Sequence, residues 1–359
     1  MKGNNILAVW DRMGDYHRAR VQAVRYAFPD RQVFSADLGS SDALYGWSNT
    51  EESLHFQLSS KPPGSFDIGR VIKFIKLLSS SRIGCVCIAG YGRPEYVLFL
   101  IYARLTGRKV ILFAESWYPS SSLFEKVKSV FLRWTCDGFL VSGKRARDHF
   151  AGRLNIDDEK IRTGYSVVDN NYFATQGRTH SRKILCVARF APEKNLEQLI
   201  KSFNSSSLPS KGWELVIVGG GPLQRTLEDR SAGTPVSLAN WQSYNELPGV
   251  YQSAAVFVLP SLFEPWGLVV NEAMAASLPL ILSDKVGCLP DFLREGSNGW
   301  SFDTTVPGAL TNVFNNVANT SDEALAEMGR QSFSLVKDHS VDLFAANLKV
   351  LILLQSYAG

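Results

Sequence analysis

The strongest constraint on the fold is the alternation of short apolar runs with longer amphipathic segments along most of the 359-residue chain. The runs are rich in Val, Ile, Leu and Phe, and Gly, Ser or Asp bounds them. This pattern is typical of buried parallel strands, each followed by a helix that covers the sheet. The predicted strands are 6–9, 33–36, 85–89, 110–113 and 139–141 in the first half, and 184–187, 215–218, 235–238, 256–259 and 279–282 in the second. We therefore expect an α/β protein with two Rossmann-like, doubly wound parallel sheets, one in each half.

The boundary between the halves is predicted from a change in composition. Residues 170–182 are polar and lack periodicity, which is typical of a linker between domains. We expect a first domain over 1–172 and a second over 173–340. The remaining segment, 341–359, is apolar on almost every face from Leu348 onward, so it is predicted to form a buried helix that returns toward the first domain.

Composition and charge exclude several classes of protein. With 45% hydrophobic and 20% charged residues, the chain is not disordered, collagenous or a disulfide scaffold. The net charge of +4 is too diffuse to indicate nucleic-acid binding. The five cysteines are an odd number scattered in apolar runs, and the five histidines are dispersed, so we expect buried thiols and no metal site. No apolar run has the length of a secretory or membrane-spanning segment, which predicts a cytoplasmic protein.

The segment 256–277 carries the richest chemistry. It is predicted to be a strand, a loop and then a helix that begins near Gly267, whose N-terminus offers backbone N–H groups to a phosphate. Glu264 in the loop and Glu272 in the helix can then face one crevice, where paired hydroxyls of a ribose or sugar would donate to their carboxylates. The alternative is that Glu264 caps the helix and Glu272 is an ordinary solvated residue.

A second candidate set of site residues follows the strand 184–187. Arg189 and Lys194 lie in a loop that leads into a helix, for which Asn195 and Gln198 predict a capping box. Two cations at the carboxyl end of a parallel strand suit a diphosphate. The alternative is a surface ion pair between Lys194 and Glu193 or Glu197.

Glycines mark two further turns. Gly219–Gly221 fails as a dinucleotide fingerprint because Gln224 replaces the third glycine and 239–241 offers no carboxylate for a ribose. We expect instead a tight strand-to-helix turn that lines a crevice, with Gly219 as a candidate donor-binding residue. Trp241 is either a platform for a nucleotide base or a core residue. Gly14, after the first strand, would let the backbone approach a ligand.

The helix predicted around 123–134 combines an apolar stripe with a basic face. Leu123, Phe124, Val127, Val130, Phe131 and Trp134 form the stripe, and Lys126, Lys128 and Arg133 lie on the remaining face. With Lys144, Arg145 and Arg147, the region 126–147 is a candidate for peripheral contact with an anionic membrane. The alternative is a helix that packs its stripe on the sheet and leaves a solvated basic face.

The order and spacing of these motifs resemble the retaining GT-B glycosyltransferases of glycosyltransferase family 4. The resemblance rests on Ala188-Arg189 followed by Lys194-Asn195, on 218–222, and on 261–276 with Pro279, and it covers essentially the whole second domain. Within 261–276, Glu264 and Glu272 match the family's E-x7-E motif. The first domain matches only in layout.

The resemblance implies roles for individual residues. Arg189 and Lys194 would bind the donor diphosphate with the backbone of Gly267 and Leu268, helped from the first domain by Gly14. Glu272 would hold the nucleotide ribose, and Glu264 would contact the transferred sugar near its anomeric carbon.

The chain also departs from the family. Ala188 stands where the family usually has Gly, and Gly14 stands alone where many members have two glycines. Phe113-Ala114-Glu115-Ser116 lacks the family's His-Asp pair, which leaves Glu115 as a candidate replacement for the catalytic histidine.

The implied activity is transfer of a sugar from a nucleoside diphosphate sugar to the hydroxyl of a glycan, lipid-linked or small-molecule acceptor, with retention of anomeric configuration. By analogy the acceptor belongs to bacterial surface polysaccharide or glycoconjugate synthesis. No Asp-x-Asp occurs in the chain, so we expect neither a metal nor another cofactor. The alternatives are a nucleotide-sugar-binding protein without catalysis, and a GT-B enzyme of another type, such as an epimerase or phosphorylase.

Overall fold

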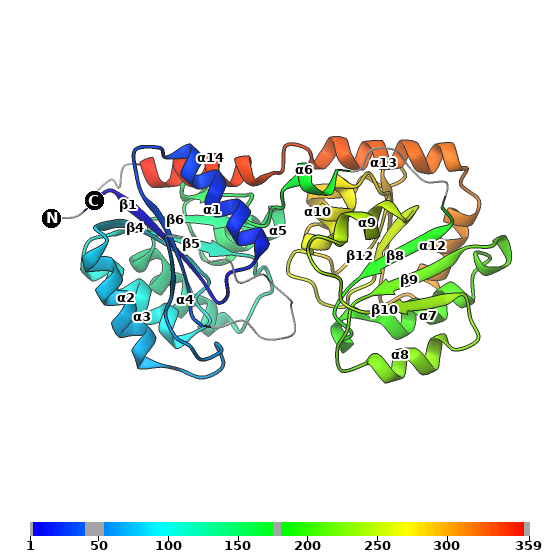
Figure 1. The fold of residues 1–359 in the computed structure, drawn as a ribbon, viewed down its shortest axis with the longest axis horizontal. Helices are drawn as coiled ribbons and strands as arrows, with labels where there is room; N and C mark the ends of the chain where they lie inside the picture. The colour runs from blue at the N-terminus through cyan, green and yellow to red at the C-terminus, as the bar shows by residue number, and fades with distance from the viewer. Residues whose placement is uncertain (1–2, 40–53, 175–180, 355–359) are drawn as a thin grey trace. The chain divides into compact units, whose positions relative to one another are not determined.

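The chain folds into two compact units. The computed structural model describes residues 3–39, 54–174 and 181–354, and Figure 1 shows both units. The first unit consists of Met1–Val167 and His339–Gly359, and the second of Val168–Asp338. The boundary predicted at 172/173 falls inside helix α6 (Asn170–Phe173), and part of the predicted linker, 175–180, lies outside the described residues.

A parallel sheet of seven strands, in the order β3-β2-β1-β4-β5-β6-β7, forms the centre of the first unit. Its strands are β1 (Asn5–Trp10), β2 (Val33–Asp37), β3 (His55–Gln57), β4 (Ile83–Ala89), β5 (Lys109–Ala114), β6 (Gly138–Val141) and β7 (Ile161–Arg162). The helical segments are α1 (Asp15–Ala27), α2 (Ile68–Ser80), α3 (Pro94–Leu105), α4 (Ser122–Thr135), α5 (Lys144–Asp148), η1 (His149–Arg153), η2 (Asp158–Lys160) and α14 (Val341–Leu353). All five strands predicted for this half are present.

Successive side chains of the strands point to opposite faces of the sheet and pack into two separate apolar layers. In β1, Leu7 and Val9 join the layer under α2, α3 and α4, whereas Ile6 and Ala8 join the layer under α1 and α14. Helices therefore cover both faces of the sheet, which is the doubly wound arrangement predicted from the sequence.

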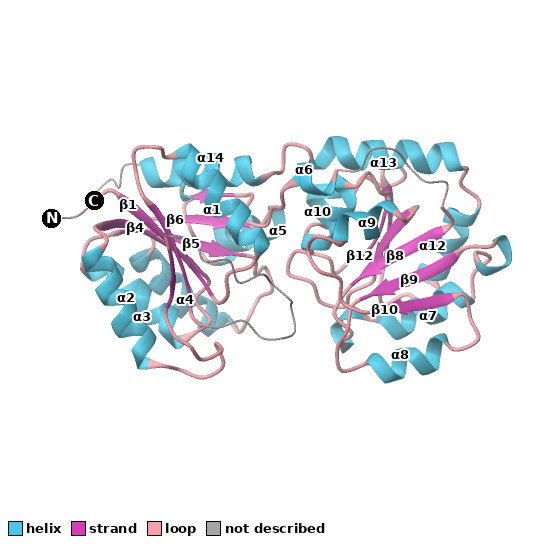
Figure 2. Ribbon diagram, in the orientation of Figure 1, coloured by secondary structure: helices cyan, strands magenta, loops and turns pink. Residues whose placement is uncertain are grey.

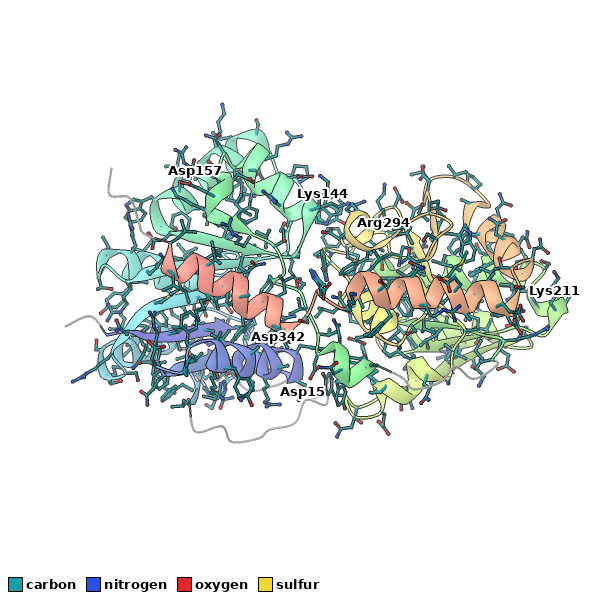
Figure 3. All side chains as sticks on the ribbon, turned by 90° about the horizontal axis from the view of Figure 1, so that it is seen from above. Asp15, Lys144, Asp157, Lys211, Arg294 and Asp342 are labelled. Carbon is teal, nitrogen blue, oxygen red and sulfur yellow. The ribbon has the colours of Figure 1, made fainter. Side chains whose placement is uncertain are left out.

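Helix α14 belongs to the first unit although it follows the whole second unit in the chain. It packs against α1, and Figure 3 shows the two helices side by side, with Asp15 at the start of α1 and Asp342 at the start of α14. Phe344 and Leu348 are buried against the sheet, but Val350 and Leu353 are exposed. The predicted return of this helix to the first domain is therefore confirmed, but the helix is not buried all round, because α14 covers the sheet with one face only.

The second unit contains a parallel sheet of six strands in the order β10-β9-β8-β11-β12-β13 (Figure 2). Its strands are β8 (Lys183–Val187), β9 (Glu214–Val218), β10 (Val236–Ala239), β11 (Val256–Leu259), β12 (Leu280–Ser283) and β13 (Gly299–Phe302). Besides α6, the helical segments are η3 (Pro192–Lys194), α7 (Leu196–Asn204), η4 (Pro209–Lys211), α8 (Gln224–Ser231), α9 (Leu247–Gln252), α10 (Leu268–Ala275), α11 (Leu289–Phe292), α12 (Ala309–Ala318) and α13 (Asp322–Val336). The five strands predicted for this half are all present.

Two local predictions need correction. The capping box at the start of α7 does not form, because Asn195 is left-handed (φ 57°) and donates to the carbonyl of Pro260 at 3.2 Å, while Gln198 donates to Ser202. In α4, the alternative that packs the apolar stripe on the sheet is wrong, because Leu123 and Val130 are exposed. The five cysteines are buried and unpaired, as predicted.

Candidate active site

The loop between β8 and α7 carries the two predicted phosphate-binding cations. Arg189 remains about half exposed (52%) and donates to the carboxylate of Glu193 at 2.5 Å. This hydrogen bond from the guanidinium lowers the pKa of Glu193. Lys194 does not pair with Glu193 or with Glu197. Glu197 instead lies 3.5 Å from Arg230. The alternative proposed for Lys194 from the sequence is therefore wrong.

Lys194 pairs with Glu264, which comes from the loop after β11. The ammonium nitrogen lies 2.5 Å from Glu264 Oε2, and the two side chains are only 17% and 12% exposed. Two backbone contacts join the same loops, since Leu262 N–H donates to the carbonyl of Glu193 and the Asn195 amide donates to that of Pro260. The structure thus brings together two site residues that lie seventy positions apart in the sequence.

The turn after β12 supports the loop that contains Glu264. Gly287 N–H donates to the carbonyl of Glu264 at 3.0 Å, and Cys288 N–H donates to that of Trp266 at 3.1 Å. The buried indole of Trp266 in turn donates to Asn271 at 2.9 Å. Sequence reasoning missed this supporting turn, although 284–288 directly follows a predicted strand at the same edge of the sheet.

Helix α10 begins where the sequence predicted. Gly267 precedes the helix with φ +100°, a left-handed conformation that side chains rarely adopt, and a Cβ there would lie 3.2 Å from Leu259 Cδ2. Leu268 is the first helical residue. Because the first N–H groups of a helix have no partner within the helix and lie at its positive end, they suit an anion such as phosphate.

Glu272 is buried inside the second unit. Its side chain is in α10, only 1% of the residue is exposed, and Oε2 accepts a hydrogen bond from the buried Tyr251 hydroxyl at 2.6 Å. The alternative of a solvated helix residue is therefore wrong. Sequence reasoning missed Tyr251, because nothing in the sequence connects its position in α9 to Glu272.

The glycine turn after β9 packs against the loop that holds Arg189. Gly219 has φ +155°, and a Cβ there would lie 1.9 Å from the carbonyl oxygen of Ala188. Phe190 N–H also donates to the carbonyl of Gly220 at 2.8 Å. Trp241 lies against Gly220 and keeps 39% of its surface exposed, so it is not a core residue.

Gly14 and Glu115 belong to the first unit, whereas the other candidate residues belong to the second. Gly14 precedes α1 in an extended conformation (φ −124°), and its N–H donates to His17 Nδ1 at 3.3 Å. Burial, with the charges of Arg20 and Arg18, lowers the pKa of His17, so its ring is neutral at pH 7 and can accept this bond. Sequence reasoning gave His17 no role.

Glu115 directly follows β5. Its Oε1 accepts a hydrogen bond from the hydroxyl of Ser166 at 2.5 Å. Nearby, Arg20 donates to the carbonyl of Val167 and lies 5.1 Å above the ring of Tyr165. The structure therefore places Glu115 in a polar network at the carboxyl end of the first sheet.

The described part of the chain contains neither a cluster of metal ligands nor a membrane-spanning helix. Over 3–39, 54–174 and 181–354, no group of three or more His, Cys, Asp or Glu side chains is arranged to hold a metal ion. In those same ranges, every helix is too short or too polar to cross a bilayer.

The architecture is that of the GT-B glycosyltransferase class. The chain superimposes on a glycosyltransferase from Rickettsia africae with a TM-score of 0.76 and 14% identity, covering 99% of this chain and 100% of the other. It also superimposes on Anabaena HepE, solved in complex with UDP-glucose, with a TM-score of 0.71 and 13% identity over 96% and 98% of the two chains. The α/β class and the GT-B fold expected from the sequence are therefore confirmed.

Most of the second unit is similar to the family described as glycosyl transferases group 1, whose model matches residues 168–333. Among individual relatives, the O-antigen chain mannosyltransferase RfbU of Salmonella typhimurium is 29% identical over 191 residues. That match covers 51% of this chain and 52% of the relative, so the chain spans about half the length of RfbU.

Proposed function

We propose that the chain transfers a sugar from a nucleoside diphosphate sugar to an acceptor hydroxyl, with retention of anomeric configuration. The observation that carries this proposal is the Lys194–Glu264 ion pair in the unit that matches the group 1 family. In the absence of a donor each charge neutralises the other. An incoming diphosphate would compete with Glu264 for the ammonium group, and its attached sugar would supply hydroxyls to the released carboxylate.

The proposed chemistry is stabilisation of the departing diphosphate. Negative charge develops on the leaving group as the bond to the anomeric carbon breaks, and cations already fixed in place lower that barrier. Lys194 and Arg189 would supply the positive charge, and the N–H groups of Gly267 and Leu268 would add hydrogen bonds. We expect this set to work without a metal, so transfer should persist when a chelator is added.

We assign the nucleoside to Glu272 and Trp241. Glu272 uses Oε2 to accept from Tyr251, and its carboxylate has further lone pairs for a ribose hydroxyl. The partly exposed face of Trp241 offers a stacking surface to the base. From the first unit, we assign Gly14 to the diphosphate and retain Glu115 as the candidate replacement for the family histidine.

Relatives guide the proposal for donor and pathway. One structural neighbour was solved with UDP-glucose, and one relative is named as an O-antigen chain mannosyltransferase. We infer a nucleotide-activated hexose as donor and a bacterial surface polysaccharide or glycoconjugate as product. We also propose that the protein works on the cytoplasmic side of the membrane.

The test is replacement of Lys194 by Ala, with Lys201→Ala as the matched control. Lys201 is an exposed lysine in α7, outside the proposed site. We expect Lys194→Ala to lower kcat/KM for donor turnover by about 10²–10³-fold, as for loss of one fixed donor to a developing charge. Near-normal activity of the variant would refute the phosphate assignment.

Product analysis separates the alternatives. Transfer to an acceptor supports a transferase, and NMR of the new linkage reports whether anomeric configuration is retained. An isomerised nucleotide sugar would indicate an epimerase, and phosphate-dependent cleavage of a glycan a phosphorylase. Tight nucleotide-sugar binding without turnover across an acceptor panel would indicate a binding protein.

A further inference from the structure

Helix α4 exposes its apolar face. Leu123, Val127, Val130 and Trp134 recur at intervals of four, three and four residues, so they form one stripe along the helix. All four are exposed, with Leu123 at 72% and Val130 at 69%. Helix α2, which packs on the same apolar layer of the first unit, shows the usual arrangement, since its Phe74 and Leu78 are fully buried. A contiguous apolar stripe on the surface indicates an interaction site.

Polar contacts under α4 hold the helix in this orientation. Glu125 and Lys128 are buried on the inward face, and the Lys128 ammonium lies 2.6 Å from the Glu125 carboxylate. Glu125 also accepts a hydrogen bond from the backbone of Ser120 at 3.0 Å and lies 3.4 Å from the ring of His149. Turning the apolar stripe inward would break this buried cluster, which is costly for charged groups. The buried polar cluster under α4 therefore keeps the apolar stripe on the outside of the first unit.

Cations border the exposed stripe. Lys126 and Arg133 are exposed on one side of it, and within the described ranges neither forms an ion pair. The more distant cations predicted to contribute are already engaged, since Lys144 pairs with Asp148 and Arg147 pairs with Asp158. The cationic part of the surface is therefore α4 itself, a smaller region than 126–147.

A groove of about 420 Å³ lies beside the C-terminal half of the stripe. Val130, Arg133 and Trp134 line one side of it, and Phe139 and Ile156 are buried apolar residues that also line it. Lys160, paired with Asp157 at 2.8 Å, adds a further charged pair to its lining. Asp157 is labelled in Figure 3. The groove thus combines an apolar lining with cationic groups, as does the stripe beside it.

We propose that the exposed face of α4 docks on an anionic lipid bilayer, with the helix lying in the plane of the interface. Exposed Leu, Val and Phe side chains would enter the boundary of the acyl chains, Trp134 would occupy the interfacial level, and Lys126 and Arg133 would meet lipid phosphates. A second copy of the chain fits less well, because two such faces would bring like charges together. This inference goes beyond the proposed chemistry and stands without it.

Vesicle co-sedimentation of the full chain tests the proposal. We expect binding to vesicles that contain phosphatidylglycerol, little binding to pure phosphatidylcholine, and a loss of binding as salt rises. The variant Val127→Glu/Val130→Glu should lose binding, and Lys126→Gln/Arg133→Gln should weaken it about fivefold for each cation removed. Val306→Glu, which changes an exposed valine of the second unit, and Lys201→Gln are the matched controls and should bind like the unaltered protein.

Three results would overturn the proposal. One is absence of binding by the unaltered protein to anionic vesicles. Another is equal binding by Val127→Glu/Val130→Glu when its circular dichroism and thermal unfolding match those of the unaltered protein. The third is a dimer in sedimentation velocity that the same variant abolishes while vesicles have no effect, which would assign the face to a second copy of the chain.

Discussion

Replacing Tyr251 by Phe removes one hydroxyl from the second unit and keeps the aromatic ring. That hydroxyl donates to Glu272 at 2.6 Å, and both side chains are buried. A hydrogen bond to a charged group contributes about 1.5–3 kcal/mol, and its loss removes a donor from a buried carboxylate. We expect the free energy of unfolding of the second unit to fall by that amount. For a unit of this size, the melting temperature should fall by about 3–12 °C.

Hydrogen exchange measured by mass spectrometry is the suitable assay, because it resolves the two units of the chain. Peptides from α10 should exchange faster in Tyr251→Phe, whereas peptides from α2 in the first unit should not change. Tyr172→Phe is the matched control, since the Tyr172 hydroxyl donates to neutral oxygens, including the carbonyl of Tyr244 at 3.3 Å. We expect a smaller effect there, about 0.5–1.5 kcal/mol.

A double-mutant cycle with Glu272→Gln isolates the interaction. If the hydroxyl acts through Glu272, the two substitutions should be non-additive, with a coupling of about 0.5–3 kcal/mol. Strict additivity, or α10 exchange equal to that of the unaltered protein, would refute the reasoning. The nucleotide affinity of Tyr251→Phe then reports separately on the proposed ribose contact.

Three further predictions concern the glycine turn, a buried histidine and the proposed base platform. Gly219→Ala should lower the free energy of unfolding by more than about 1–3 kcal/mol, because the new Cβ would lie 1.9 Å from a carbonyl oxygen. Urea unfolding measures this loss, with Gly233→Ala as the control, since a Cβ at Gly233 would have no neighbouring atom within 4 Å. Burial lowers the pKa of His339 to about 4, so the unfolded chain binds a proton that the folded chain does not. Stability should therefore be complete above about pH 6.5 and fall as pH falls toward about 4, and His339→Gln should flatten this slope in unfolding measured across that range. Trp241→Ala should weaken nucleoside diphosphate binding by about 1–3 kcal/mol in calorimetry, whereas an affinity equal to that of Trp134→Ala would count against stacking.

Sequence patterns predicted the inner strands of both sheets and one edge strand, β10, but missed the other three edge strands. β3, β7 and β13 lie at sheet edges and were not predicted. Edge strands bury fewer side chains, so His55–Gln57 contains no continuous apolar run, and β7 has only two residues. The inner strands, such as β4, are buried on both faces and carry an unbroken apolar signal.

The candidate site was predictable where local chemistry defines it. Gly267 marked the start of α10, and Arg189 and Lys194 were found because they follow a clear strand. The partners of these residues were not predictable, because pairs such as Lys194–Glu264 depend on which loops the sheet order brings together. The orientation of α4 was also ambiguous from the sequence. The buried face of this helix carries the Glu125–Lys128 ion pair, and the apolar stripe faces outward.

The position of α14 has a consequence for folding during synthesis. The apolar layer under α1 needs Phe344, Leu348 and other residues of α14, yet these emerge from the ribosome only after the whole second unit. At the ends of the second unit, the Asn170 amide donates to the carbonyl of Val336 at 2.8 Å, so that unit closes on itself. The first unit therefore starts folding before the second and finishes after it. Until α14 is synthesised, α1 covers only part of this face of the first sheet, and the remaining apolar surface is open to chaperones or to aggregation.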